Sequence, residues 1–208
     1  MASSQTEPKT GKGRQTREHI LQAAFRLFLL KGYEASTIVE LIETSGMSRG
    51  AIFYYAPDKL SLYRAVVDRF VIGMQALVDR VTYDDDTSLY EFMLRYIRRV
   101  SEVMDNLLSI PGYTPALYFN MVYQASIYYP ESRAKITELF VHEDKAWGRI
   151  IERDIRRGLL RRDIDVRRTV QHFRHAYLGL SVEVSLRGTL DVDELKALFL
   201  DIYDRIKQ

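Results

Sequence analysis

The residues with the clearest potential for chemistry lie in a short segment, residues 48–55, where a predicted helix turns polar side chains outward. Ser48 is a good helix cap, Pro57 ends the helix, and Ile52 points inward. The outward face then carries Arg49, Gly50, Phe53 and Tyr54. A helix of this size fits the DNA major groove and reads base edges with its first residues. The chemistry predicted for this segment is recognition of bases.

Two further helices are needed to position this segment. Residues 14–31 form the first, with an apolar stripe and a Lys31–Gly32 ending. The second begins at Thr37, which has capping-box spacing to Glu40, and it is broken near Gly46, whose positive φ lets two helices cross sharply. This is the helix-turn-helix pattern. Its predicted core consists of Phe25, Phe28, Leu41, Ile42 and Ile52.

Residues 17–59, REHILQAAFRLFLLKGYEASTIVELIETSGMSRGAIFYYAPDK, resemble the N-terminal domain of TetR-family repressors. The resemblance includes the aromatic residue after Gly32, the helix start at Thr37, Gly46 with Ser48, the aromatic run 53–55, and Lys59. It covers roughly the first quarter to third of the chain. The remainder resembles the family only in its pattern of helices.

The resemblance implies DNA contacts for a defined set of residues. Thr37 is expected to meet a phosphate at a helix start, and Lys59 to anchor the DNA backbone. Arg49 is expected to bind a guanine, and Ala51 to touch a thymine methyl group. The whole set is Arg17, Thr37, Ser48, Arg49, Gly50, Ala51, Phe53, Tyr54, Tyr55 and Lys59.

Two positions depart from the family pattern. The family usually has tyrosine at the position of Phe53, so a hydroxyl that would contact a phosphate is missing. It usually has a large apolar residue at the position of Ala56, and we expect Leu60 or Tyr55 to fill that space.

Helical periodicity recurs through the rest of the chain, so the predicted fold class is all-α with about nine helices. A helix capped by Asp58 is expected to run to about Val81. We predict a flexible basic tail at 1–13, a three-helix helix-turn-helix DNA-binding domain at 14–57, and a C-terminal helical domain at 58–208 that binds an effector and dimerises.

Aromatic and methionine side chains are frequent after residue 83, as in apolar small-molecule sites. The predicted ligand-binding residues are Tyr96, Met104, Tyr118, Phe119, Tyr123, Trp147 and His175. The last two helices resemble the dimer-forming pair of the family. The predicted dimer interface comprises Phe173, Tyr177, Leu180, Val184, Leu198 and Ile202.

Composition limits the function classes. The chain has no cysteine, which excludes thiol catalysis and disulfides, and its net charge of +2 gives no overall basic excess. No catalytic motif, cofactor motif or metal-ligand set is recognised, so we predict neither an enzyme nor a cofactor. A divalent cation at the acidic run 84–86, or an anion at the arginines of 153–168, is less expected than solvated charge. No secretory signal or spanning segment is found at the sequence level, so the expected location is cytoplasmic.

The combined prediction is a homodimeric transcriptional repressor that leaves a near-palindromic double-stranded DNA operator when a small, largely apolar molecule binds. The alternative is a helical interaction or scaffold protein that does not bind DNA. The effector, the operator sequence, the regulated genes, and the choice between repression and activation are not encoded in any recognisable pattern.

Overall fold

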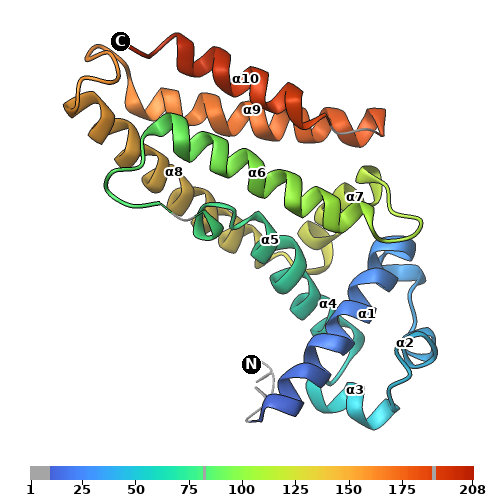
Figure 1. Ribbon diagram of the computed structural model, residues 1–208. Helices are drawn as coiled ribbons and strands as arrows, with labels where there is room; N and C mark the ends of the chain where they lie inside the picture. The colour runs from blue at the N-terminus through green and yellow to red at the C-terminus, as the bar shows by residue number, and fades with distance from the viewer. Residues whose placement is uncertain (1–9, 82, 189–190) are drawn as a thin grey trace. The chain divides into compact units, whose positions relative to one another are not determined.

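The structure is a computed structural model that describes residues 10–81, 83–188 and 191–208. Within these ranges every regular element is helical, and only an isolated bridge joins Leu160 to Lys207. The predicted all-α fold is therefore confirmed (Figure 1). The α-helices are α1 (Gly11–Ala35), α2 (Ile38–Ser45), α3 (Arg49–Tyr55), α4 (Lys59–Val66), α5 (Gly73–Gln75), α6 (Leu89–Leu108), α7 (Pro115–Tyr128), α8 (Ser132–Arg156), α9 (Val166–Arg187) and α10 (Val192–Asp204).

The first helix begins earlier than predicted. The Thr10 side chain caps α1 by accepting a hydrogen bond from the Gly13 amide, so residues 11–13 belong to the helix and not to a flexible tail. The rest of the predicted tail, residues 1–9, lies outside the described residues. Near the other end, Gly32 has φ 78° and ψ 168°, a conformation essentially restricted to glycine. The predicted helix break at Gly32 is thus present.

The helix predicted from residue 58 to about Val81 is wrong as a single α-helix. Asp58 caps α4 as expected, but the α-helix ends at Val66 and continues as a π-helix over Val67–Ile72. The Gly73 amide donates to the Asp68 carbonyl five residues earlier, which is the π-helical pattern. The short α5 and a 3₁₀ turn over Val78–Arg80 follow. Val67, Val71 and Ile72 of the π-helix are β-branched, and β-branched residues lower helix propensity slightly.

The chain folds into two compact units. The first contains the described residues of Met1–Met74, with Ile110–Tyr113 and Leu117–Ala134. The second contains Gln75–Ser109, Thr114–Ala116 and the described residues of Lys135–Gln208. Most of α7 therefore packs with the N-terminal helices. The predicted functional boundary at residues 57/58 stays a prediction, because it concerns function and not packing.

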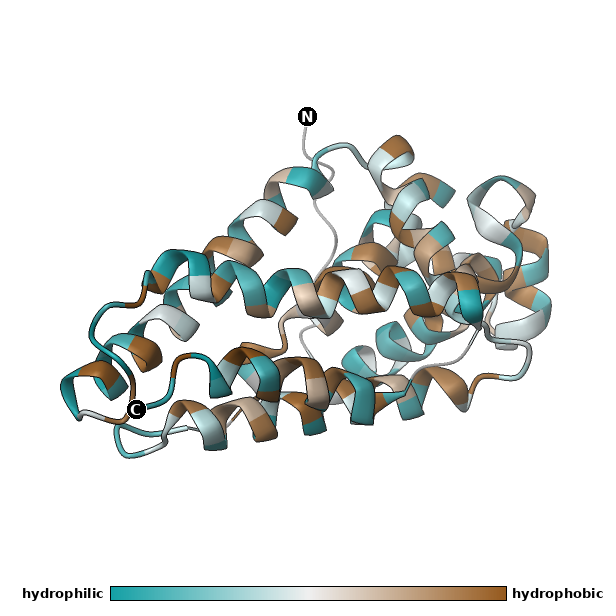
Figure 2. Cartoon of the chain, turned by 90° about the horizontal axis from the view of Figure 1, so that it is seen from above, coloured by the Kyte–Doolittle hydropathy of each residue, from teal (hydrophilic) through white to brown (hydrophobic). Residues whose placement is uncertain are grey.

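The second unit is a helical bundle in which α9 and α10 lie side by side along α6 (Figure 1). Polar and apolar residues alternate around each helix, as amphipathic helices require (Figure 2). Aromatic rings form the centre of its core. Trp147 stacks on Phe173 with centroids 4.9 Å apart, and meets Phe92 edge to face at 4.9 Å. No helix in the described part of the chain is long and apolar enough to cross a membrane.

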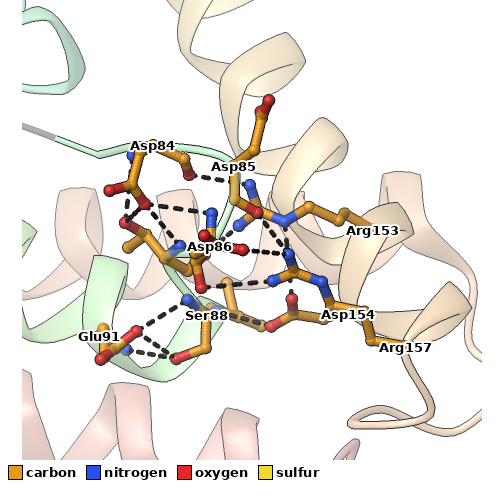
Figure 3. A network of polar contacts seen from close by, with 10 residues as sticks. Asp84, Asp85, Asp86, Ser88, Glu91, Arg153, Asp154 and Arg157 are labelled. Atoms are coloured by element: carbon orange, nitrogen blue, oxygen red, sulfur yellow. Dashed lines mark hydrogen bonds and ion pairs between the residues drawn. The ribbon is translucent and has the colours of Figure 1, made fainter.

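A polar network joins the loop before α6 to the end of α8 (Figure 3). Arg153 donates to the carbonyl oxygens of Asp84 and Thr87, and Arg157 donates to those of Asp85 and Asp86. Asp154, only 1% exposed, accepts a 2.6 Å hydrogen bond from the Leu89 amide. These two arginines, expected on a solvated face, instead bind loop carbonyls. The network fixes the start of α6.

Candidate nucleic-acid interface

The turn between α2 and α3 has the geometry expected of a helix-turn-helix. Gly46 ends α2 with φ 66°, and its amide donates to the Ile42 carbonyl at 3.0 Å. Two residues later Ser48 starts α3 by accepting a hydrogen bond from the Ala51 amide at 3.2 Å. Ile52 is fully buried and holds α3 against the core. One face of α3 is thereby fixed inward and the other is left to solvent.

The outward face of α3 carries the residues predicted to read DNA. Arg49 and Gly50 are exposed, and Tyr54 keeps 61% of its surface exposed. The Arg49 guanidinium lies over the Phe53 ring, 5.3 Å from its centroid, one helical turn away. This cation–π contact limits the rotation of a long side chain and directs it along the helix surface. Ala51 and Phe53 are half-buried.

At the start of α2, a carboxylate occupies the position where an anion is favoured. Thr37 forms the predicted capping box with Glu40, whose Oε2 accepts from the Thr37 amide at 3.0 Å and from its hydroxyl at 3.1 Å. Lys31 also pairs with Glu40. The hydrogen bonds from Lys31 and then Thr37 lower the pKa of Glu40. The donors expected to bind phosphate thus already hold a negative charge.

Besides Thr37, three more of the predicted DNA-contacting residues have partners within the chain. The Tyr55 hydroxyl donates to the Gly13 carbonyl at 3.2 Å. Lys59 donates to the Glu34 carbonyl at 3.1 Å, and its ammonium lies 4.5 Å from the centre of the Tyr33 ring. Arg17 is half-buried and also engaged within the chain. Ala56, at the unusual small position, is 3% exposed.

A tyrosine cluster that the sequence did not indicate ties the helix-turn-helix to α7. Tyr63 is fully buried, its hydroxyl donates to the Met121 carbonyl at 3.2 Å, and burial raises its pKa. Tyr33 lies between Tyr63 and Tyr128, with centroid distances of 4.8 and 4.4 Å. The Tyr33 amide donates to Gln124 Oε1 at 2.8 Å. No local spacing signals such contacts, because the hydrogen-bonded partners are 58 and 91 residues apart in sequence.

The predicted ligand-binding residues are divided between the two units. Tyr118, Phe119 and Tyr123 belong to the first unit, and Tyr123 is 68% exposed. Tyr96 and Trp147 are buried in the aromatic core of the second unit, with Met104 packed against it. His175 is exposed on α9. The role of these seven residues in ligand binding stays a prediction.

The residues predicted to form the dimer interface differ in how deeply they are buried. Phe173, Leu180 and Val184 are 1%, 5% and 4% exposed and face the core of their own unit, so these side chains are not free to meet a partner. Tyr177 and Ile202 are half-buried against the same core. Leu198 is 40% exposed. The dimer interface itself stays a prediction.

Within the described residues, no group of three or more histidine, aspartate or glutamate side chains is placed to hold a metal ion. The Asp84 carboxylate accepts hydrogen bonds from the amides of Asp86 and Thr87, which forms a local turn. The groups that the candidate DNA interface offers are hydrogen-bond donors, the Arg49 guanidinium and aromatic rings.

Comparison with known proteins finds a family match within the N-terminal part of the chain. Residues 20–66 match the family described as "Bacterial regulatory proteins, tetR family". Among curated relatives, the transcriptional repressor AcnR of Corynebacterium diphtheriae is 48% identical over 62 residues, which is 30% of this chain and 33% of that protein. The repressor BepR of Brucella suis is 40% identical over 55 residues, or 26% of each chain. These matches span about a quarter to a third of the relatives' length.

Solved structures extend the likeness in fold to nearly the whole chain. A TetR-family transcriptional regulator from Cytophaga hutchinsonii aligns with a TM-score of 0.70 and 20% identity, covering 96% of this chain and 98% of that one. A TetR-family regulator from Agrobacterium tumefaciens aligns with a TM-score of 0.68 and 17% identity, over 94% and 100% of the two chains. At this identity the likeness concerns the fold.

Proposed function

We propose that this chain, whose residues 20–66 match the TetR family model and whose fold is similar to that of TetR-family regulators, is a homodimeric, ligand-responsive transcriptional repressor that binds operator DNA in the cytoplasm. The observation that carries the proposal is the exposed face of α3, presented by a glycine turn and a serine cap. No catalytic role is proposed.

We assign the ten predicted residues to two kinds of DNA contact. The start of α3 reads base edges, with the Arg49 guanidinium suited to a guanine. Phosphates are bound around it by side chains with hydroxyl or cationic groups. Because Thr37, Tyr55 and Lys59 have partners in the free chain, each must exchange or share one hydrogen bond on binding DNA. The hydrogen bonds of the free chain keep these side chains ordered before DNA binds.

The homodimer is proposed to form through exposed residues on α9 and α10. His175, Gly179, Val182 and Leu186 follow one another at spacings of four, three and four residues, which places them on one stripe of α9. All four are exposed; Val182 and Leu186 have 50% and 84% of their surface accessible. Gly179 has open space above it, which permits a close helix approach. Helix-turn-helix dimers bind half-sites about 34–36 Å apart, so the operator is proposed to be near-palindromic.

The effector is proposed to be a small, largely apolar molecule bound by the second unit. The aromatic core around Trp147 supports this proposal, since apolar walls with few polar groups are usual for such sites. Binding of effector and of DNA must be reciprocally coupled, so operator DNA should weaken effector affinity by the same factor.

The DNA-binding proposal is tested with Arg49→Ala. Removal of a bidentate guanine contact should weaken binding to the selected site by about 1–3 kcal/mol and relax its sequence preference. Operator sequences are first selected from random duplex DNA with the wild-type chain, and affinities are then measured by gel shift. Arg98→Ala, an exposed arginine on α6, is the matched control and should bind normally. If wild-type protein selects no sequence, the chain is a scaffold or interaction protein instead.

The dimer proposal is tested with Leu186→Asp. A charge at this exposed apolar position should shift the mass measured by light scattering from dimer to monomer, because two carboxylates would meet across the axis. Leu159→Asp introduces the same charge at another exposed leucine and should leave the mass unchanged. A dimeric Leu186→Asp would place the interface elsewhere.

A further inference from the structure

The core of the second unit contains a small cavity of about 10 Å³. A cavity of this size holds about one water molecule. Its walls include four aromatic rings, two carboxylates and one guanidinium, contributed by Tyr96, Glu143, Asp144, Trp147, Phe173, Arg174 and Phe199. Asp144 and Arg174 are the most accessible of the charged groups here, with side chains 35% and 20% exposed, and they mark the side that opens to solvent.

Glu143 is the unusual group in this cavity. It is 8% exposed, and its Oε1 atom is buried without a hydrogen-bond partner in the described part of the chain. The carboxylate also accepts backbone hydrogen bonds from Val78 and Leu77, at the start of the 3₁₀ turn after α5. Burying a carboxylate with an unsatisfied oxygen is costly, so a missing partner is indicated.

The neighbouring arginine does not supply that partner. Arg174 Nη1 lies 2.7 Å from both carboxylate oxygens of Asp144, and its guanidinium is 5.4 Å from the centre of the Phe140 ring. The other charged group near Glu143 is Asp79, which pairs with His142. Burial, with smaller contributions from Asp144 and Asp79, raises the pKa of Glu143 to about 7. The local charge therefore favours an added cation.

The four rings that line the cavity together with Glu143 pack directly against one another. Trp147 lies 5.2 Å from Tyr96, 4.9 Å from Phe173 and 5.9 Å from Phe199, measured between centroids. Tyr96 also contacts the Tyr177 ring at 6.1 Å. Aromatic faces attract ammonium groups electrostatically, most strongly where water is excluded.

We propose that this cavity binds the ammonium group of a small protonated amine, with Glu143 as the counter-charge and the four rings as its walls. An ammonium group is close to a water molecule in size, so it fits the cavity, and its N–H groups satisfy Oε1. Because Glu143 also holds the Leu77–Val78 turn, the amine would act on the segment that directly follows α5. The proposal rests on the proposed function only in naming this amine as an effector.

The single tryptophan of the chain, Trp147, reports directly on the cavity. Methylammonium chloride is titrated into the full chain, without DNA, one pH unit above the pKa of Glu143. We expect a saturable change in tryptophan fluorescence, absent with methanol and with potassium chloride. Glu143→Gln should weaken binding about tenfold or more, because a charge-assisted contact is lost. Glu138→Gln, an exposed glutamate on the same helix, should bind as wild type.

A second measurement uses only the wild-type chain. Since the amine needs the ionised carboxylate, its affinity should fall about tenfold for each pH unit below the pKa of Glu143. An absent or non-saturable response, an unchanged affinity in Glu143→Gln, or a pH-independent affinity would overturn the proposal. If the chain binds the amine but no operator DNA, this inference holds and the proposed function is wrong. If it binds operator DNA but no amine, the proposed function holds and this inference is wrong.

Discussion

Replacing Glu143 by glutamine should change how the stability of the second unit depends on pH. The folded-state pKa of this carboxyl is raised from 4.5 to about 7 by burial. Below pH 4.5 the carboxyl is protonated in both the folded and the unfolded state and has no effect on stability. As pH rises from 4.5 to 7, the unfolded state releases the proton first, so the free energy of unfolding falls. Above pH 7 the loss is complete.

The size of this effect follows from the shift in pKa. Each pKa unit is worth about 1.4 kcal/mol, so the raised pKa corresponds to a loss of about 3 kcal/mol at high pH. Glutamine does not titrate and still offers a carbonyl oxygen to the amides of Val78 and Leu77. Relative to wild type, Glu143→Gln should therefore gain about 2.5 kcal/mol between pH 5 and pH 8.

The assay is urea unfolding of both proteins at several pH values, followed by Trp147 fluorescence and circular dichroism. Taking the difference between the two proteins removes the contribution of every other titrating group, because those groups are shared. The reasoning that Glu143 is buried without a counter-charge is refuted if the difference in free energy of unfolding stays constant from pH 5 to pH 8. It is also refuted if Glu143→Gln loses stability relative to wild type over that range.

Two further substitutions test the backbone and the polar network. Gly32→Ala should reduce the free energy of unfolding by about 1–3 kcal/mol, since the glycine-only conformation is strained for alanine and the new Cβ would lie 3.0 Å from Gln124 Nε2; urea unfolding measures this, and an unchanged midpoint contradicts it. Asp154→Ala should cost about 2–3 kcal/mol by leaving the buried Leu89 amide without an acceptor. The exposed Asp86→Ala is its control, and equal losses in the two variants would show that the buried carboxylate has no special role.

The sequence predicted the helix-turn-helix with little error. Thr37, Gly46 and Ser48 act where the pattern placed them, because caps and glycine turns depend on residues within four positions of one another. The fold class followed for the same reason. The π-helix after Val66 was missed, since periodicity alone does not separate an i→i+5 hydrogen bond from an i→i+4 one.

Tertiary structure decided which of the recognised residues remain available. Phe173, Leu180 and Val184 share the apolar character of a dimer seam, yet contacts with distant helices bury them in their own unit. Lys59 was assigned to phosphate from the family pattern, and only packing brings the Glu34 carbonyl to its ammonium.

The sequence by itself thus determined the fold class, the caps at Thr37, Ser48 and Asp58, and the outward face of α3, all of which follow from short-range periodicity and hydrogen bonding. The three-dimensional packing alone placed Glu143 among aromatic rings with an unpartnered oxygen. A glutamate in the middle of an amphipathic helix reads as solvated until the neighbouring helices are in place. The burial of Glu143 determines its protonation and the ligand proposed for it. That burial depends on contacts with residues that are distant in the sequence, so no local stretch of sequence predicts it.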